Sequence, residues 1–235
     1  RLWKSKKNIF MITFKDNTQA MYDAETNFNL LMTPERLSKF LVHYEAFKKI
    51  RNIKGNIVEA GVYKGTSFSR FSMLRKLFKK ESSKLIGFDV FEEPYPETKY
   101  SNEKKQREHW IKTAGGVSIS KKNLERILKK KGIKNFELIK GDVLKTIPKF
   151  KKRNNIKIAL LNVDIDFVES TECVLYNLYE NVVKGGVILF DNYRGIGTSG
   201  IQYKGETRVI NKFLNSVKKK PLSFKNIEKP MFIVK

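Results

Sequence analysis

Residues 57–67 constrain the fold of this chain more than any other stretch. A short apolar run ends in Glu59, Gly61 follows two residues later, Gly65 comes four residues after that, and a helical pattern begins at Ser67. This order predicts a strand, a glycine loop and a helix. The glycines would bring the backbone close to a ligand, and the free amides of the helix N-terminus would favour electron-rich groups. The stretch indicates a nucleotide-type ligand site, although an ordinary strand-to-helix turn has the same pattern.

The glycine spacing separates the classes of nucleotide site. Dinucleotide sites carry Gly-x-Gly-x-x-Gly, whereas Val62 and Tyr63 follow Gly61 here and the next glycine is Gly65. The sequence also lacks the Gly-Lys-Ser/Thr of a phosphate loop. An acid, then a glycine, then Gly-Thr-Ser is similar to the S-adenosylmethionine sites of class I methyltransferases. We therefore expect S-adenosylmethionine as cofactor, bound by Glu59, Gly61, Tyr63, Gly65, Thr66 and Ser67.

Apolar runs alternate with helical patterns along most of the chain. Such alternation implies right-handed crossovers and a mainly parallel sheet. We expect an α/β fold, a doubly wound, Rossmann-like sheet of about seven strands that ends in an antiparallel hairpin. The expected strands lie at about residues 56–60, 85–89, 136–140, 158–164 and 187–190, with the hairpin near 222–224 and 231–234.

The N-terminal segment differs from the rest. Residues 1–31 mix charged and aromatic side chains without a clear period, and we expect an arm or lid there, followed by a single methyltransferase domain over residues 32–235. Thr33 and Pro34 predict a helix start as N-cap and first helical residue. Apolar residues then follow at helical spacing and predict the packed face of that helix: Leu37, Phe40, Leu41, Tyr44 and Phe47.

Residues 91–116 are polar and contain two prolines and a Gly-Gly pair, which predicts a long loop. Loops of this length in compact domains are usually functional or disordered. His109 and Trp110 lie where a lid over the substrate would be, and we count them as candidate substrate contacts. The sequence favours the simpler interpretation, a surface histidine beside a half-buried tryptophan.

The amino-acid composition says less than the motifs about which class of molecule the protein binds. The net charge is +24, from 48 Lys+Arg against 24 Asp+Glu, which would attract nucleic acid, an anionic membrane or a phosphorylated substrate. The lysines are scattered in short runs, so a solvated surface accounts for them as well. A single cysteine, Cys173, excludes an internal disulfide framework. Because no apolar run has the length of a membrane span or the character of a signal peptide, we expect a cytoplasmic protein.

Acids follow several of the expected strands. In a doubly wound sheet, ligands bind beyond the carboxyl ends of the strands, where an acid can accept hydrogen bonds from ribose hydroxyls. Asp89 is our ribose candidate, and Asp142, which follows Gly141, is our candidate for the adenine amino group. Either acid would also suit a simple loop cap.

A second group of polar residues follows the fourth and fifth expected strands, at Asp164 and at Asp191-Asn192. Adjacent strands would bring these oxygen donors to one edge of the sheet, and hard oxygen donors suit Mg2+ or a similar cation. Such a cation would bind a substrate hydroxyl, lower its pKa and hold it in line with the methyl group. A nearby carboxylate would remove the proton, and Asp164 is our preferred base.

These motifs together resemble the macrocin O-methyltransferase family. The resemblance covers most of the chain from about residue 30, including residues 32–37, 55–65, 89–92 and 210–213. Its most specific part is Leu161-Asn162-Val163-Asp164-Ile165-Asp166-Phe167-Val168-Glu169-Ser170-Thr171, followed by Tyr179, Gly185-Gly186 and Phe190-Asp191-Asn192-Tyr193.

Enzymes of that family methylate sugar hydroxyls of macrolide and related glycosides with S-adenosylmethionine and a divalent metal. The resemblance implies a metal at Asp164, Asp191 and Asn192 and proton removal by an acid of this cluster. We add Phe91 to the cofactor-binding residues and Tyr193 to the candidate substrate contacts. Homo-oligomers are common in the family, so we also expect a homo-oligomer.

The chain departs from the family pattern in three places. Asp191-Asn192 stands where two consecutive acids are usual and is similar to the Asp-Asn metal pair of catechol O-methyltransferases. Asn211 replaces a usual acid, and the loop over residues 194–205 looks longer than expected. These departures leave the chemistry in place and put the substrate in doubt.

The leading hypothesis is a Mg2+-dependent O-methyltransferase acting on a sugar hydroxyl, with a nucleotide-linked, lipid-linked or glycoside sugar as acceptor. A catechol or other small phenol is the first alternative. The second is an RNA-binding protein or RNA methyltransferase, which the charge would suit. Because the sequence shows no separate RNA-binding domain and no basic stripe with interleaved aromatics, we do not expect a nucleic-acid partner.

Overall fold

The computed structural model describes residues 18–153, 155–195 and 202–235. Its contacts divide the chain into two units, Arg1–Thr33 and Pro34–Lys235. In the first unit, α1 (Thr18–Leu31) is a helix with no buried residue. The first half of the expected N-terminal arm, residues 1–17, lies outside the described residues. Everything below concerns the second unit.

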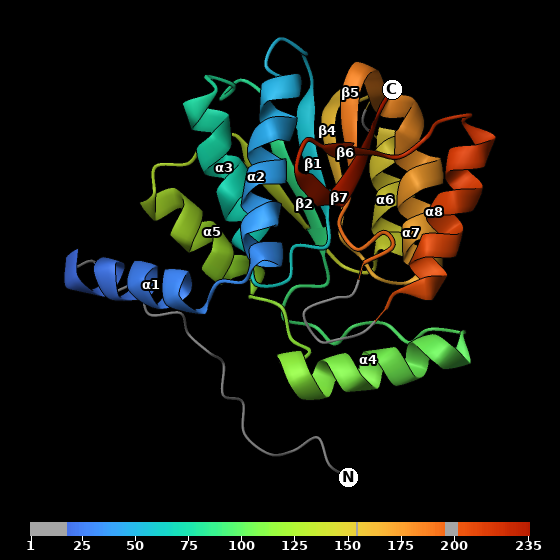
Figure 1. The fold of residues 1–235 in the computed structure, drawn as a ribbon, viewed down its shortest axis with the longest axis horizontal. Helices are drawn as coiled ribbons and strands as arrows, with labels where there is room; N and C mark the ends of the chain where they lie inside the picture. Colours follow the sequence, from blue (N-terminus) through green and yellow to red (C-terminus); the bar gives the residue numbers. More distant parts are fainter. Residues whose placement is uncertain (1–17, 154, 196–201) are drawn as a thin grey trace. The chain divides into compact units, whose positions relative to one another are not determined.

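The second unit is built on one seven-stranded sheet of order β3-β2-β1-β4-β5-β7-β6 (Figure 1). The neighbouring pairs from β3 to β5 are parallel, whereas β7 runs antiparallel to both β5 and β6. This confirms the predicted fold class, including the C-terminal hairpin. The strands are β1 (Asn56–Ala60), β2 (Leu85–Asp89), β3 (Phe136–Lys140), β4 (Ile158–Val163), β5 (Val182–Phe190), β6 (Leu222–Phe224) and β7 (Ile227–Val234).

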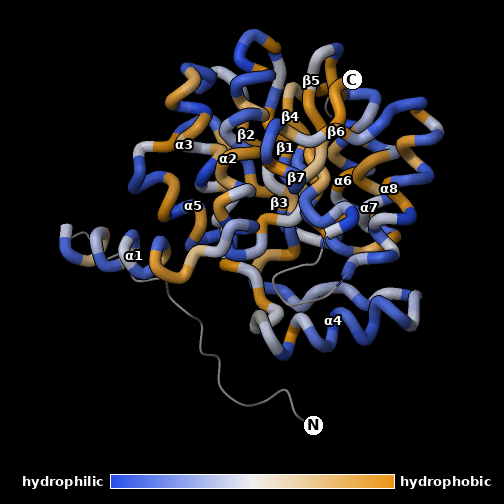
Figure 2. Tube along the Cα trace, in the orientation of Figure 1, coloured by the Kyte–Doolittle hydropathy of each residue, from blue (hydrophilic) through white to orange (hydrophobic). Residues whose placement is uncertain are grey.

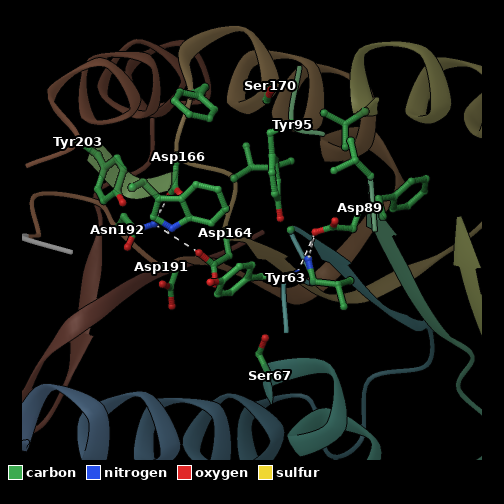
Figure 3. A pocket seen from close by; sticks show the side chains of 18 of the residues that line it. Tyr63, Ser67, Asp89, Tyr95, Asp164, Asp166, Ser170, Asp191, Asn192 and Tyr203 are labelled. Carbon is green, nitrogen blue, oxygen red and sulfur yellow. Dashed lines mark hydrogen bonds between the residues drawn. The ribbon is translucent and has the colours of Figure 1, made fainter. Parts of the chain in front are cut away.

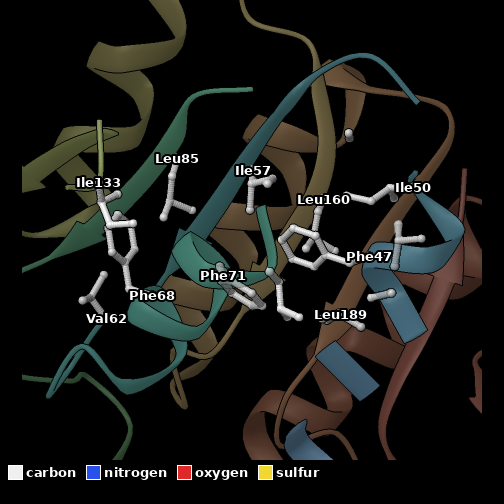
Figure 4. Close-up of a cluster of buried hydrophobic side chains, with 14 of the residues drawn as sticks. Phe47, Ile50, Ile57, Val62, Phe68, Phe71, Leu85, Ile133, Leu160 and Leu189 are labelled. Atoms are coloured by element: carbon white, nitrogen blue, oxygen red, sulfur yellow. The ribbon is translucent and has the colours of Figure 1, made fainter. Parts of the chain in front are cut away.

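Helices cover both faces of the sheet, because successive residues of a strand point to opposite sides. Ile57 of β1 packs in a cluster with α2 (Pro34–Lys49), α3 (Thr66–Leu77) and α5 (Lys121–Lys130) (Figure 4). Its neighbour Val58 packs in the opposite cluster, formed with α6 (Val143–Arg153), α7 (Val168–Leu178) and α8 (Lys204–Ser216). A short 3-10 helix, η1 (Tyr179–Asn181), joins α7 to β5. The sheet thus has a core on each side.

The strand order places a topological switch point between β1 and β4. From β1 the chain proceeds outward to β2 and β3, then crosses back so that β4 pairs with the other side of β1. Ligands of open α/β sheets bind in the crevice at such a point, beyond the carboxyl ends of the strands. The loops that follow β1, β2, β4 and β5 all begin at this edge of the sheet.

The prediction of a long loop over residues 91–116 is wrong for more than half of that range. Residues Ser101–Ala114 form helix α4, which lies outside the two layers of helices that flank the sheet (Figure 1). Figure 2 shows α4 as mostly hydrophilic, and its few apolar residues, Trp110, Ile111 and Ala114, lie near its C-terminal end and are too few to give an apolar period. A period search therefore cannot find this helix.

The packed face expected for α2 is also wrong in part. Leu37, Leu41 and Tyr44 are each more than two-fifths exposed, whereas Val42 and His43 are buried. The helix is rotated because its inner face carries polar side chains of the cavity described below as well as apolar ones. None of the described helices has the length and apolar character needed to cross a bilayer.

Candidate active site

The loop after β1 is held against its neighbours by backbone contacts. Gly61 has a φ of +92°, a left-handed conformation that suits glycine. A Cβ atom there would lie 1.7 Å from the carbonyl oxygen of Asp164, so a side chain has no space. Gly65, with a φ of +79°, precedes the first residue of α3. The predicted strand, glycine loop and helix are all present.

Asp89, at the end of β2, fixes the shape of this loop. Its Oδ2 accepts hydrogen bonds from the backbone N–H groups of Val62 and Tyr63, both at 2.9 Å. Its Oδ1 accepts from the N–H of Phe91 at 2.7 Å and from the hydroxyl of Ser118 at 2.6 Å. Four such bonds occupy the acceptor sites of one carboxylate. A ribose hydroxyl would therefore have to replace one of these donors, and the Ser118 hydroxyl is the one that is free to rotate.

A cavity of about 510 Å³ opens beyond the carboxyl ends of β1, β2, β4 and β5. Small-molecule sites usually have volumes of this order. Figure 3 shows Asp164, Asp166, Asp191 and Asn192 gathered on one side of the cavity and Asp89 with Tyr63 on another.

Aromatic side chains form part of the cavity wall. Trp110 of α4 lies between Tyr63, with ring centroids 5.2 Å apart, and Tyr95, with centroids 4.9 Å apart in an edge-on arrangement. The Tyr95 hydroxyl is 2.7 Å from the Oγ of Ser118. Burial is the main cause that raises the pKa of Tyr95 above its ordinary value, so the phenol stays protonated. These rings provide the flat apolar surface on which a nucleoside or sugar ring can lie.

Three carboxyl groups and one amide meet at the ends of β4 and β5. The side-chain amide of Asn192 donates to Asp166 and, at 3.4 Å, to Asp164. Burial and the Asp191 charge raise the pKa of Asp164 well above its ordinary value and that of Asp166 to about 7. Burial would raise the pKa of Asp191 too, but the neighbouring Lys39 ammonium outweighs it and holds this carboxyl ionised.

Helices α2 and α3 supply a basic wall that our sequence analysis missed. Arg36, Lys39, His43 and Arg70 all line the cavity. Lys39 forms an ion pair with Asp191. Arg70 contacts the Nδ1 of His43 at 3.0 Å, and burial and the Arg70 charge lower the pKa of His43 to about 3. The histidine is therefore neutral, and its Nδ1 accepts the hydrogen bond from Arg70.

Two further acids are buried near the cavity. Glu59 is 0% exposed, accepts a hydrogen bond from Asn162 at 3.0 Å and has a pKa raised by burial to about 8. Glu206 of α8 is also 0% exposed, and within the described part of the chain neither of its carboxyl oxygens has a hydrogen-bond partner. Burial and the charges of Asp166 and Asp164 raise the pKa of Glu206.

The structure brings together most of the residues that the sequence singled out, but not all of them. Glu59, Gly65 and Phe91 lie in the core beneath the loops and do not line the cavity. His109 is exposed on α4, and Tyr193 is 1% exposed with its hydroxyl donating to Asn211 at 2.6 Å, so neither lines the cavity. The expected residues that line it are Gly61, Tyr63, Thr66, Ser67, Asp89, Trp110, Asp142, Asp164, Asp191 and Asn192.

The donor set fits a hard divalent cation in chemistry and charge. Within the described residues, no three His, Cys, Asp or Glu side chains converge as a ready-made metal site. The expected set, however, has two carboxylates and an amide, and a half-turn of the Asn192 amide would present its oxygen to the same space. Of the three carboxyl groups here, Asp191 is paired with Lys39, and the carboxyl oxygens of the nearby Glu206 have no hydrogen-bond partner among the described residues. Oxygen donors with excess negative charge are what Mg2+ and Mn2+ bind.

The sheet order and the glycine loop are those of the class I methyltransferase fold. The crystal structure of CalS11, a calicheamicin methyltransferase, matches with a TM-score of 0.70 and 19% identity, covering 93% of this chain and 87% of that one. The structure of the O-methyltransferase NovP matches with a TM-score of 0.69 and 17% identity, covering 84% and 79%. At these identities the two structures show a common fold.

The family follows from the sequence comparison. The model of the macrocin O-methyltransferase family, TylF, matches residues 15–222, and the chain belongs to this family. It is an S-adenosylmethionine-dependent O-methyltransferase, as the motifs predicted. A search of curated proteins gave no match.

Proposed function

We propose that the chain transfers the methyl group of S-adenosylmethionine to a sugar hydroxyl, with a divalent cation held by Asp164, Asp191 and Asn192. The observation that carries this proposal is the convergence of the glycine loop and the oxygen donors on one cavity. Family membership supports the acceptor class, because the family is that of a sugar O-methyltransferase. S-adenosylmethionine supplies the methyl group, and the cation, when bound, lowers the pKa of the acceptor hydroxyl.

The chain's own groups would divide the work as follows. The Gly61 loop, shaped by Asp89, holds the cofactor, with Asp142 at the adenine end. The aromatic wall around Trp110 excludes water from the acceptor. A carboxylate takes the hydroxyl proton as the oxygen attacks the methyl carbon, and S-adenosylhomocysteine leaves with the electron pair of the broken carbon–sulfur bond. Asp164 keeps the role of base that we expected, and Asp166, which also lines the cavity, is the second candidate.

An anionic acceptor is part of the proposal. Arg36, Lys39, Lys64 and Arg70 all line the cavity, and arginine and lysine are the usual partners of phosphate groups. The solved relative CalS11 is described as a TDP-rhamnose 3'-O-methyltransferase, an enzyme that acts on a nucleotide-linked sugar. We therefore propose a nucleotide-linked sugar as the first acceptor to test. A cytoplasmic location and a homo-oligomeric state remain predictions.

The test begins with calorimetric titration of the purified chain with S-adenosylhomocysteine, with and without Mg2+. S-adenosylmethionine consumption is then followed against nucleotide sugars, unlinked sugars and a catechol. Mg2+-dependent turnover of a nucleotide sugar alone is the expected result. Turnover of the catechol alone would move the acceptor to a phenol, and turnover that persists in excess chelator would remove the metal from the proposal. Failure to bind S-adenosylhomocysteine would contradict the assigned cofactor site.

A further inference from the structure

The Lys39 side chain occupies the place where a cation would meet Asp191. Lys39 lies near the start of α2 and reaches the end of β5, 152 residues further along the chain, to form the ion pair. The Asp191 side chain is 2% exposed, whereas that of Lys39 is 28% exposed and lines the cavity. The anion of this pair is thus enclosed, and the cation is the partner that faces open space.

The surrounding charges explain why an ammonium is held there. Asp191 and Asp164 both attract Lys39, and Arg36, one turn earlier on α2, repels it. Arg70, on α3, is occupied by His43 and lies with its guanidinium carbon 3.5 Å from the centre of the Phe40 ring. Burying a carboxylate without a counter-charge is costly. Lys39 therefore supplies the positive charge that Asp191 needs when no metal is bound.

We propose that Lys39 is a built-in competitor of the divalent cation: its ammonium holds the Asp191 position, and the metal enters only as the lysine withdraws. The proposal rests on the proposed function, because it takes Asp191 as a metal ligand. Lys39 then sets the affinity for the metal and keeps the acid cluster neutralised before the metal arrives.

Of the two partners in the Lys39–Asp191 ion pair, the lysine is the one that can move. The backbone N–H of Asp191 donates to the carbonyl of Val163 at 3.1 Å, which continues the pairing of β4 with β5 and fixes the backbone that carries this short side chain. The lysine is linked to its helix by a flexible chain of four methylenes, and the cavity provides space into which it can turn. Exchange of one cation for the other therefore requires side-chain rotations alone, that of Lys39 away from Asp191 and the half-turn of the Asn192 amide, with no change in the backbone.

The experiment measures Mn2+ binding to the full chain by electron paramagnetic resonance and calorimetry, for wild type, Lys39→Met and Lys39→Gln. We expect both variants to bind Mn2+ about tenfold more tightly or better, because the metal no longer has to break an ion pair. Lys48→Met is the matched control, since Lys48 lies on the same helix and pairs with Glu45 on the surface. It should bind Mn2+ as the wild type does.

Thermal unfolding gives a second readout. Without metal, Lys39→Met leaves Asp191 unpaired and should melt at a lower temperature than wild type, and Mn2+ should raise its melting temperature by more than it raises that of wild type. Lys39→Gln, whose amide can still donate to Asp191, serves if the methionine variant does not fold. Unchanged or weaker Mn2+ binding in a folded Lys39 variant would overturn the proposal, as would an absence of binding in all proteins.

S-adenosylhomocysteine binding without metal separates this proposal from the proposed function. If the wild type binds S-adenosylhomocysteine but the Lys39 variants gain no Mn2+ affinity, the methyltransferase site stands and the competitor role of Lys39 is wrong. If the variants gain Mn2+ affinity but S-adenosylhomocysteine does not bind, the acid cluster is a metal site and the proposed cofactor site is wrong.

Discussion

A side chain at Gly61 would collide with the main chain of Asp164, because a Cβ atom built on the glycine lies 1.7 Å from the carbonyl oxygen of that aspartate. The first glycine of the loop after β1 and the first acid of the proposed metal site are therefore in contact through their backbones. The contact continues the pairing of β1 with β4, where the N–H of Asp164 donates to the carbonyl of Ala60 at 2.9 Å. The loop after β1 and the acids after β4 are therefore held by the same pair of strands.

This contact predicts that Gly61→Ala is severe. The variant should lose roughly 3 kcal/mol or more of unfolding free energy, since the strand ends must separate and a side chain adds strain to the left-handed backbone. Gly132→Ala is the matched control: it also has a positive φ, of +69°, but nothing lies within 4 Å of its Cβ position. It should cost only about 1 kcal/mol. If Gly61→Ala and Gly132→Ala lost equal amounts of unfolding free energy in urea, the contact with Asp164 would not be important for stability.

Asp164→Asn should leave S-adenosylhomocysteine affinity nearly unchanged and lower kcat by about 100-fold or more, the usual effect of losing a general base or a metal ligand. The comparison with Asp166→Asn separates the two roles. A base alone would lose kcat while Mn2+ binding is retained, whereas a metal ligand would lose both. Normal turnover in Asp164→Asn would refute both roles for this residue.

Glu59 predicts a pH dependence of stability. Its folded pKa of about 8 lies above its ordinary value of 4.5, mainly because of burial, so the folded chain holds a proton that the unfolded chain releases. Its contribution to stability is complete below pH 4.5 and is lost as the pH rises towards 8. The unfolding free energy of the ligand-free wild type, minus that of Glu59→Gln, should fall by roughly 1 kcal/mol for each pH unit between 5 and 7.5.

The control for this experiment is Glu137→Gln, because Glu137 is a partly exposed carboxylate of β3 paired with Lys84. Its difference from wild type should change little over the same pH range. A flat difference for Glu59→Gln as well would mean that Glu59 is ionised in the folded chain.

The buried contacts of Glu103 indicate that this residue holds α4 over the cavity. It is 3% exposed, accepts a hydrogen bond from the N–H of Val168 at the start of α7 at 2.8 Å, and accepts another from the Thr98 hydroxyl at 2.7 Å. Glu103→Gln keeps the shape but replaces one acceptor oxygen by a donor. It should cost about 1–2 kcal/mol locally and raise the KM of the acceptor through the displaced Trp110.

Hydrogen exchange checks this prediction. The amides of α4 should exchange faster in Glu103→Gln than in wild type, while those of β1 and β4 keep their protection. Glu108→Gln is the control, since Glu108 lies exposed on the same helix. Unchanged exchange in α4 would indicate that other contacts hold the helix.

The sheet could be predicted from the sequence because parallel strands that are buried on both faces appear in it as continuous runs of apolar residues. β4 is buried along its whole length, and its run from Ile158 to Val163 is interrupted only by Asn162. The acids that follow such runs were equally visible. α4 could not be found in this way, because its position depends on side-chain contacts such as that of Glu103 with α7 and not on an apolar face.

The missed residues of the site have a common cause. Lys39 and Arg70 are two of 48 basic residues, and nothing in their local sequence distinguishes a cation that faces inward from the many that face solvent. Glu206 lies in the first turn of α8, where an acid is ordinarily explained by the helix dipole. The rotation of α2 that turns His43 inward is visible only in the structure, because the apolar pattern of the sequence favours a different face of this helix.

The attachment of α4 by side chains has a consequence for how acceptor preference can change. This helix contributes Gln106, Trp110 and Thr113 to the cavity wall, yet within the described residues it is not a partner in any strand pairing. Its sequence can therefore vary without shifting the register of the sheet or the loops that hold the cofactor and the acids. In evolution, and in engineering, the cavity-facing positions of α4 are therefore the place to change acceptor preference: substitution of Gln106, Trp110 and Thr113, with Glu103 kept as the anchor, would alter the cavity wall while the strands of the sheet keep their register.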